Sequence, residues 1–178
     1  MKIYLVGFMG AGKTSVGRAL AGRLGVPFFD LDELVESAEG MSIREIFAER
    51  GEPHFRKRER EILRTTQHVE NGVFATGGGT FTFDENIQFV LAHGLSVYLA
   101  ASFATLLRRI GDKAAERPMF RDEESLRELH QYRLRYYKMS DITIDIRDEE
   151  SIPEIVERLF MQLPREALGR QSRRPRTP

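Results

Sequence analysis

The residues with the clearest chemical meaning form a glycine-rich loop near the start of the chain. Residues Gly7–Thr14 read Gly-Phe-Met-Gly-Ala-Gly-Lys-Thr, after the apolar run Ile3–Val6 and ahead of a helix-like stretch that begins at Ser15. In such a loop, backbone N–H groups surround an anionic oxygen and the following helix points its positive end there. The loop lysine reaches the outer phosphates, and the threonine hydroxyl ligates Mg²⁺. The loop therefore predicts a site for a nucleotide triphosphate.

Two carboxylates follow the second apolar run of the chain. Asp30 and Asp32 are two residues apart, so in an extended segment both side chains would lean to the same side, toward the glycine-rich loop. One could hold the water shell of a metal ion while the other faces the acceptor of the phosphate. The alternative is that Asp30 or Asp32 only caps a helix that begins at Glu33. The pair alone does not decide between these readings.

Three consecutive glycines, Gly77–Gly79, follow the third apolar run. Consecutive glycines are costly to order unless another group must approach the backbone closely. The group expected to approach the backbone is a substrate hydroxyl or a γ-phosphate. The alternative is that the three glycines form a tight turn into the next helix. We favour the close approach, because a turn rarely needs three glycines.

Arginines supply further candidates, although each alone is more typical of a surface ion pair. The mixed charges at 56–64 are typical of a solvated helix face. Arg117, beside Pro118 in a charged stretch, could stabilise the charge on a transferred phosphoryl group when a flap closes. The planar heads of Arg56 and Arg133 would suit a carboxylate if they converge in one pocket.

The elements that must position these residues alternate along the chain. Short β-type runs are expected at 3–6, 26–29, 73–75, 96–99 and 142–146, with helix-length segments between them. This alternation is typical of a parallel sheet covered by helices on both faces, in which ligands bind beyond the carboxyl ends of the strands. Capping-box spacing at 42–45, 82–85 and 151–154 predicts three helix starts.

The composition indicates a small soluble enzyme with one core. The chain has 178 residues, of which 41% are hydrophobic and 30% charged. Its 27 basic and 27 acidic residues balance, so we expect small ligands and no nucleic-acid partner. The lack of cysteine excludes disulfides and thiolate metal sites. Without a signal-like segment or a membrane-length apolar stretch, we expect a cytoplasmic protein with no membrane contact.

Together these motifs resemble the shikimate kinase family from residue 3 to about residue 163. Besides the loop at 7–14, the match comprises Phe-Asp-Leu-Asp at 29–32 with Glu36, Gly-Met-Ser-Ile-Arg-Glu-Ile-Phe at 40–47, Gly51-Glu52, Phe55-Arg56, Ala-Thr-Gly-Gly-Gly at 75–79, Arg117-Pro118, and Arg133 ahead of Tyr137. The resemblance implies an α/β fold: the three-layer P-loop fold of the nucleoside-monophosphate kinases, with a five-stranded parallel sheet.

The domain organisation that follows is a single P-loop kinase domain at 1–163. Within it, the resemblance implies a helical substrate-binding region at about 31–61 and a mobile lid at about 111–124. The remaining residues, 164–178, are rich in arginine and proline and poor in apolar residues, so we expect a disordered tail.

The resemblance also implies a reaction, the transfer of the γ-phosphoryl group of ATP to the 3-hydroxyl of shikimate on the chorismate route to aromatic amino acids. The product would be shikimate 3-phosphate, and the enzyme is expected to be a monomer. The catalytic residues would be Lys13, Asp32 and Arg117. Asp32 would orient or deprotonate the nucleophile at an ordinary pKa near 4, because a loose transition state demands little proton removal until late.

Binding roles carry over from the same resemblance. ATP would be held by Gly10, Ala11, Gly12, Lys13, Thr14 and Ser15, with Arg109 beside the adenine and Arg117 in the lid. Shikimate would contact Asp32, Arg56, Gly78, Gly79 and Arg133. Mg²⁺ would be held by Thr14 and by Asp30, the latter through water.

The sequence also departs from the family pattern. Thr80-Phe81 follows the triple glycine in place of the usual Ala-Val, Met119-Phe120 follows Arg117-Pro118 in place of leucine, and Arg135 rivals Arg133 as the second arginine. Two other functions stay open. One is a related small-molecule kinase such as a gluconate kinase, which would not need this arginine pair. The other is a catalytically silent nucleotide-binding relative, which would lack a transfer residue.

Overall fold

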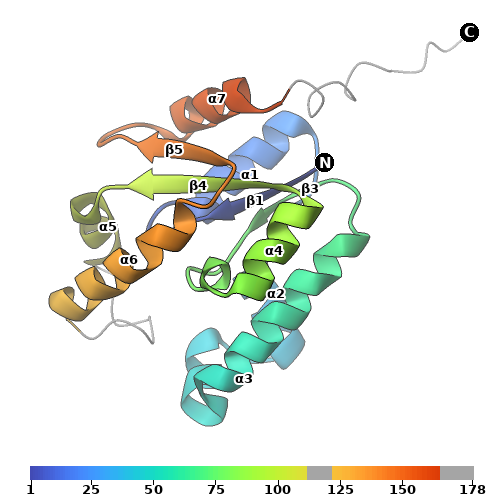
Figure 1. Ribbon diagram of the computed structural model, residues 1–178, viewed down its shortest axis with the longest axis vertical. Coiled ribbons are helices and arrows are strands. Elements are labelled where there is room, and N and C mark those ends of the chain that lie inside the picture. The colour runs from blue at the N-terminus through green and yellow to red at the C-terminus, as the bar shows by residue number, and fades with distance from the viewer. Residues whose placement is uncertain (112–121, 165–178) are drawn as a thin grey trace, which may run out of the picture.

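The computed structural model describes residues 1–111 and 122–164, in which a parallel sheet lies between layers of helices (Figure 1). Its strands are Lys2–Val6 (β1), Phe28–Asp30 (β2), Gly72–Ala75 (β3), Leu95–Ala101 (β4) and Ile142–Ile146 (β5). They form one five-stranded sheet in the order β2-β3-β1-β4-β5, and every neighbouring pair is parallel. The predicted sheet is confirmed, with each strand overlapping one of the expected runs.

Helices connect the strands and cover both faces of the sheet. They are Lys13–Leu24 (α1), Leu31–Glu39 (α2), Ile43–Thr65 (α3), Asp84–His93 (α4), Phe103–Ile110 (α5), Glu123–Tyr137 (α6) and Ile152–Gln162 (α7). Short 3₁₀ turns occupy Thr66–His68 (η1) and Thr80–Thr82 (η2). Helices α1 and α7 lie together on one side of the sheet, with α4 and α6 on the other (Figure 1).

Two of the three predicted capping boxes are confirmed. The carboxylates of Glu45 and Glu154 accept hydrogen bonds from the backbone N–H groups of Ser42 and Ser151, at 2.7 and 2.8 Å. The box predicted at 82–85 is wrong. The Thr82 hydroxyl donates instead to the carbonyl oxygen of residue 79 at 2.7 Å, because it belongs to the 3₁₀ turn that precedes α4.

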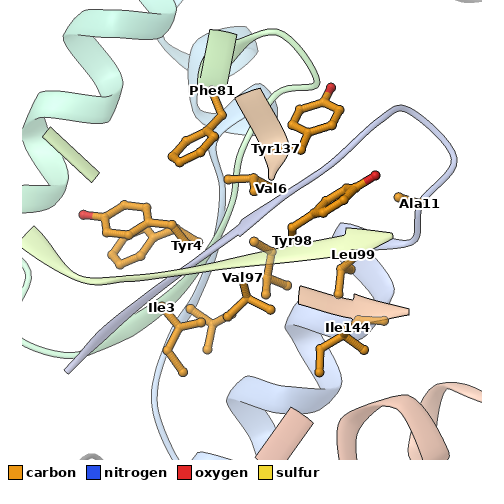
Figure 2. Packing of buried hydrophobic residues seen from close by; sticks show 14 of the residues in the cluster. Ile3, Tyr4, Val6, Ala11, Phe81, Val97, Tyr98, Leu99, Tyr137 and Ile144 are labelled. Carbon is orange, nitrogen blue, oxygen red and sulfur yellow. The ribbon is translucent and has the colours of Figure 1, made fainter. Parts of the chain in front are cut away.

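Side chains alternate along the strands, so both faces of the sheet are buried, as a parallel sheet requires. Ile3, Val97 and Ile144 point toward one face, whereas Tyr4 and Tyr98 point toward the other (Figure 2). This double burial fixes the strands firmly, and with them the loops at their carboxyl ends.

The predicted helical region at 31–61 corresponds to α2 and most of α3. Val35, Ile46 and Phe55 form a small core there, separate from the main one. Helix α3 is bent at Gly51, whose φ of 78° lies outside the helical range, and Pro53 begins the second part. The bend lets the second part of α3 run back toward the sheet.

Parts of two predicted segments lie outside the described residues. These are residues 112–121 of the lid, among them Arg117, Pro118, Met119 and Phe120, and residues 165–178 of the tail. In the described parts of the chain, no helix combines the length and the apolar character needed to cross a membrane.

A glycine of α1 tests the packing of this helix on the sheet. A Cβ at Gly17 would lie 2.5 Å from a ring carbon of Phe28 and 3.1 Å from Leu5, so we expect Gly17→Ala to lower the free energy of unfolding by about 1–3 kcal/mol. Gly22 of the same helix has nothing within 4 Å of its Cβ position, and Gly22→Ala should stabilise by about 0.5–1 kcal/mol. Urea unfolding measures both, and equal effects would contradict this packing.

Candidate active site

Two cavities open at the carboxyl ends of the strands. The loop cavity, of about 660 Å³, is lined by residues 9–16 together with Asp30, Arg109 and residues of α7. The α3 cavity, of about 490 Å³, lies between α2, α3 and the triple glycine, and Arg56 and Arg133 line it. Met9 and Asp32 line both cavities. A group bound in one cavity would therefore adjoin a group bound in the other.

The glycine-rich loop has the backbone of an anion site. Gly10 and Gly12 have φ values of 79° and 93°, a left-handed conformation that other residues rarely adopt. Gly12 precedes α1, and no described side chain caps the N-terminus of this helix, so the N–H groups of its first turn suit an anionic ligand. The Lys13 ammonium donates to the carbonyl oxygens of Gly7 and Phe8, at 2.8 and 3.0 Å. The loop thus holds its own lysine at the cavity.

Asp30 and Thr14 meet in the loop cavity. The Thr14 hydroxyl donates to Asp30 Oδ2 at 2.7 Å, and Asp30 Oδ1 accepts from the backbone N–H of Asp32 at 3.1 Å as the N-cap of α2. The two alternatives for Asp30 are thus compatible, because one oxygen caps the helix while the other faces the loop. A hydroxyl and a carboxylate side by side are the hard oxygen ligands that Mg²⁺ takes, usually in company with water and phosphate.

Asp32 lies in the first turn of α2, so the expected extended Asp-x-Asp segment is wrong. Its Oδ1 is buried and has no hydrogen-bond partner among the described residues. Burial, and then the charges of Glu59 and Asp30, raise the pKa of Asp32 to about 7, against the opposing effect of Lys13 and Arg56. The expected value near 4 is therefore wrong. A carboxylate that titrates near neutral pH suits a general base.

The groups that approach the triple glycine closely are the protein's own charged side chains, whereas the expected group was a substrate hydroxyl or a γ-phosphate. A Cβ on Gly77 would lie 2.4 Å from Glu59 Oε1 and 2.8 Å from Asp32 Oδ1. A Cβ on Gly79 would lie 2.8 Å from the Arg56 guanidinium, and one on Gly78 would lie 3.3 Å from Arg133 Nη1. Any larger residue at 77 or 79 would displace these charged groups.

Arg56 and Arg133 converge on the α3 cavity. The Arg56 side chain is 12% exposed and donates to Glu59 at 2.9 Å and to Glu52 at 3.1 Å. Arg133 is 5% exposed and lies beside Gly78. Arg56 is already paired with these two carboxylates, whereas Arg133 has no ion-pair partner among the described residues. Because burying a charge without a partner is costly, an anion bound in the cavity would compensate Arg133.

Arg135, the rival of Arg133, lies elsewhere. Its guanidinium stacks on the rings of Tyr132 and Tyr136, at 4.7 and 4.8 Å, and donates to the Tyr136 hydroxyl at 3.0 Å. These groups lie on the exposed side of α6. The structure therefore places Arg133, and not Arg135, at the cavity.

The remaining predicted residues lie around the loop cavity or outside the described chain. Arg109 lines this cavity, and its Nη1 lies 3.4 Å from the carbonyl oxygen of Gly10. Ala11 and Ser15 line it as well. Arg117 belongs to residues 112–121, which the structure does not describe.

Sequence reasoning missed Glu59, which it assigned to a solvated helix face. The Glu59 side chain is 1% exposed and contacts both Arg56 and Thr80, at 2.9 and 2.6 Å. The available signal was its spacing, because residues three apart on a helix share a face and Arg56 was already a candidate.

Arg44 also lines the α3 cavity, from the exposed side of α3, and no motif singled it out.

Comparisons with known proteins agree with this geometry. A family model described as "Shikimate kinase" matches residues 9–164. The shikimate kinase of Aquifex aeolicus (strain VF5) is 38% identical over 95% of this chain and 99% of its own. That of Ruegeria pomeroyi is 42% identical over 90% of this chain and 84% of its own.

Solved structures give the same result at the level of the fold. A shikimate kinase from Acinetobacter baumannii in complex with shikimate has a TM-score of 0.83 at 35% identity, covering 90% of each chain. A deoxyadenosine kinase from M. mycoides with bound dATP has a TM-score of 0.59 at 18% identity, covering 90% of this chain and 98% of its own. The latter shares the α/β fold alone.

The raised pKa of Asp32 predicts how stability depends on pH. Between about pH 4 and 7 the folded state holds a proton on Asp32 that the unfolded state has lost, so wild-type stability falls as pH rises through this window. The wild type should therefore lose about 2–3 kcal/mol of its free energy of unfolding, relative to Asp32→Asn, when the pH is raised from 5 to 8. Urea unfolding in metal-free buffer measures the difference.

A matched control for this measurement is Glu33→Gln, which changes an exposed carboxylate on the same turn of α2. A wild-type to Asp32→Asn difference that stays constant from pH 5 to pH 8 would show that Asp32 is ionised throughout.

Proposed function

The chain belongs to the shikimate kinase family, whose members are ATP-dependent phosphotransferases. On this basis we propose which of its residues bind each substrate and which take part in the transfer. As a shikimate kinase, it transfers the γ-phosphoryl group of ATP to the 3-hydroxyl of shikimate, and ADP leaves. The loop cavity would take ATP and the α3 cavity would take shikimate. The observation that carries this assignment is the position of Asp32, which lines both cavities.

The residues of the loop cavity would bind ATP through its phosphates. Backbone N–H groups at Gly10–Ser15 would donate to phosphate oxygens. Lys13 would exchange its contacts with loop carbonyl oxygens for contacts with the transferring group. Arg109, at the far side of the loop, would flank the adenine. Arg117 would stabilise the equatorial oxygens of the moving phosphoryl group, as an arginine carried by the lid.

Thr14 and Asp30 would hold Mg²⁺. Their oxygens already lie 2.7 Å apart in the loop cavity, and few protein ligands are typical of a magnesium ion that also binds water and substrate phosphates. When bound, the ion would neutralise charge on the phosphates that bind beside it.

The α3 cavity would hold shikimate by its carboxylate and its hydroxyls. Arg56 and Arg133 supply two planar donor heads for the carboxylate, and the backbone at Gly78 and Gly79 allows close approach of the ring. Asp32 would accept the proton of the attacking hydroxyl, in the cavity that adjoins the transferring phosphate. A carboxylate with a pKa near 7 makes a better proton acceptor than one with an ordinary pKa.

We propose further that the enzyme is a cytoplasmic monomer. A chain without cysteine needs no oxidising compartment in which to form disulfides, and both cavities are lined without the help of a second subunit. Light scattering during size-exclusion chromatography measures the oligomeric state, and a dimer mass would contradict the monomer.

The test of the function is release of ADP by the purified protein with MgATP, with and without shikimate, and with gluconate as a control acceptor. We expect shikimate to stimulate release and gluconate to leave it at the basal rate. Asp32→Asn should lower shikimate-dependent turnover about 10²- to 10⁴-fold with ATP binding preserved. Turnover of Asp32→Asn near the wild-type rate would exclude Asp32 as the proton acceptor.

A pair of arginine variants on α6 tests the carboxylate clamp. Arg133→Lys keeps the charge but loses the planar fork, and we expect the KM for shikimate to rise about 10- to 100-fold. Arg135→Lys, two residues away on the exposed side of the helix, should change KM less than about 2-fold. Steady-state kinetics at saturating MgATP measures both, and a larger effect at position 135 would reverse the assignment.

A further inference from the structure

Thr80, one of the departures from the family pattern, is fully buried behind the α3 cavity. Its hydroxyl donates to Glu59 Oε1 at 2.6 Å, and its carbonyl oxygen accepts from the side-chain amide of Asn86 at 3.0 Å. Asn86 is itself 3% exposed. Thr80 is therefore held from behind by α4 and presents its hydroxyl to α3.

Glu59 divides its two carboxylate oxygens between two partners. Oε1 accepts from the Thr80 hydroxyl, and Oε2 accepts from Arg56 Nη1 at 2.9 Å. A buried carboxylate needs hydrogen bonds to both oxygens, because each unpaired lone pair carries a desolvation cost. The hydroxyl fixes the rotation of the carboxylate, so that the other oxygen faces Arg56.

The surroundings of Glu59 leave it little freedom to turn. Oε1 lies 2.4 Å from the Cβ position of Gly77, and Asp32 Oδ1 lies 2.8 Å from the same point. The two carboxylates therefore approach one another beside this glycine, and their repulsion contributes to the raised pKa of Asp32. Without the Thr80 hydroxyl, Oε1 would face Asp32 with no donor between the pair and would turn away from it.

Rotation of the Glu59 carboxylate would also change the position of Arg56. The other carboxylate that Arg56 contacts is Glu52, whose side chain is 47% exposed. With Glu59 rotated, the guanidinium would be drawn toward Glu52 and solvent, and so away from the α3 cavity. The line of hydrogen bonds from Asn86 through Thr80 and Glu59 to Arg56 thus ends at the head that faces the cavity.

We propose that Thr80 is a positioning residue for the acceptor, acting through Glu59 to set the Arg56 head in the α3 cavity. Thr80 does not line the cavity, so it acts on the acceptor only through these partners. The inference rests on the proposed function of this cavity. This role of Thr80 has a consequence that can be measured. Binding of shikimate should depend on the Thr80 hydroxyl, whereas binding of ATP should not.

The test compares Thr80→Val, which keeps the shape of the side chain and loses the hydroxyl, with Thr80→Ser, which keeps the hydroxyl. We expect Thr80→Val to raise the KM for shikimate about 5- to 20-fold, with kcat within about 3-fold and the KM for ATP unchanged. Thr80→Ser should restore the KM for shikimate to within about 2-fold of wild type. Thr80→Ala replaces Thr80→Val if the latter does not fold, with the same expected split.

Two further variants separate positioning from a general loss of structure. Thr66→Val removes another buried threonine hydroxyl, at the opposite end of the sheet, where it bonds Tyr4 at 2.7 Å, and it should leave the KM for shikimate unchanged. In an Arg56→Lys background, Thr80→Val should raise this KM less than about 2-fold further, because both changes remove the same interaction.

The outcomes distinguish this inference from the proposed function. If wild type shows no shikimate-dependent turnover, the proposed function fails. If wild type turns over shikimate, the function stands, and the variants then test the role of Thr80. This role is overturned if Thr80→Val or Thr80→Ala leaves the KM for shikimate unchanged, or raises the KM for shikimate and the KM for ATP equally. It is also overturned if Thr80→Ser does not restore the KM for shikimate. If the effects of Thr80→Val and Arg56→Lys on the KM for shikimate are fully additive in the double variant, the role of Thr80 is overturned as well.

Discussion

The burial of charge around three glycines is the constraint on which the active site depends. Two carboxylates, Asp32 and Glu59, and the guanidinium of Arg56 crowd the backbone at Gly77 and Gly79, where Cβ atoms would collide with them. Ions withdrawn from water are tolerated only when they are paired and hydrogen-bonded. Here Glu59 is satisfied on both oxygens, while Asp32 Oδ1 has no partner among the described residues. Under the proposed function, this oxygen of Asp32 would accept the proton of the acceptor hydroxyl.

The sheet order brings these groups together without long connections. Strand β1, which leads into the glycine-rich loop, lies between β3 and β4, and β2 is the other neighbour of β3. All pairs are parallel, so the loop, the triple glycine after β3 and the aspartates at the end of β2 emerge at one edge. The bend of α3 at Gly51 then adds Arg56 and Glu59 from the side. A rigid core on both faces of the sheet holds the edge still, which suits a reaction that depends on positioning.

Much of this arrangement was predictable from the sequence, because its signals are local. The strands, the loop and two capping boxes each follow from a few neighbouring residues. The surroundings of Asp32 and Glu59 do not. The first turn of α2 begins directly after β2, so two-residue spacing did not place the two aspartates in one extended segment. The raised pKa of Asp32 and the burial of Glu59 arise from contacts between α2, α3 and the triple glycine, which no local pattern encodes. Spacing alone also left Arg133 and Arg135 undecided, since it places them on different faces of α6 and does not say which face is buried.

A crystal structure of the protein with shikimate and ADP would test the central claim most directly. The account predicts the shikimate carboxylate within about 3.2 Å of nitrogen atoms of both Arg56 and Arg133, with a ring hydroxyl at the same distance from Asp32. Glu59 would keep its bonds to Thr80 and Arg56. A carboxylate bound elsewhere, with Arg56 paired only to Glu52 and Glu59 and no hydroxyl at Asp32, would contradict it.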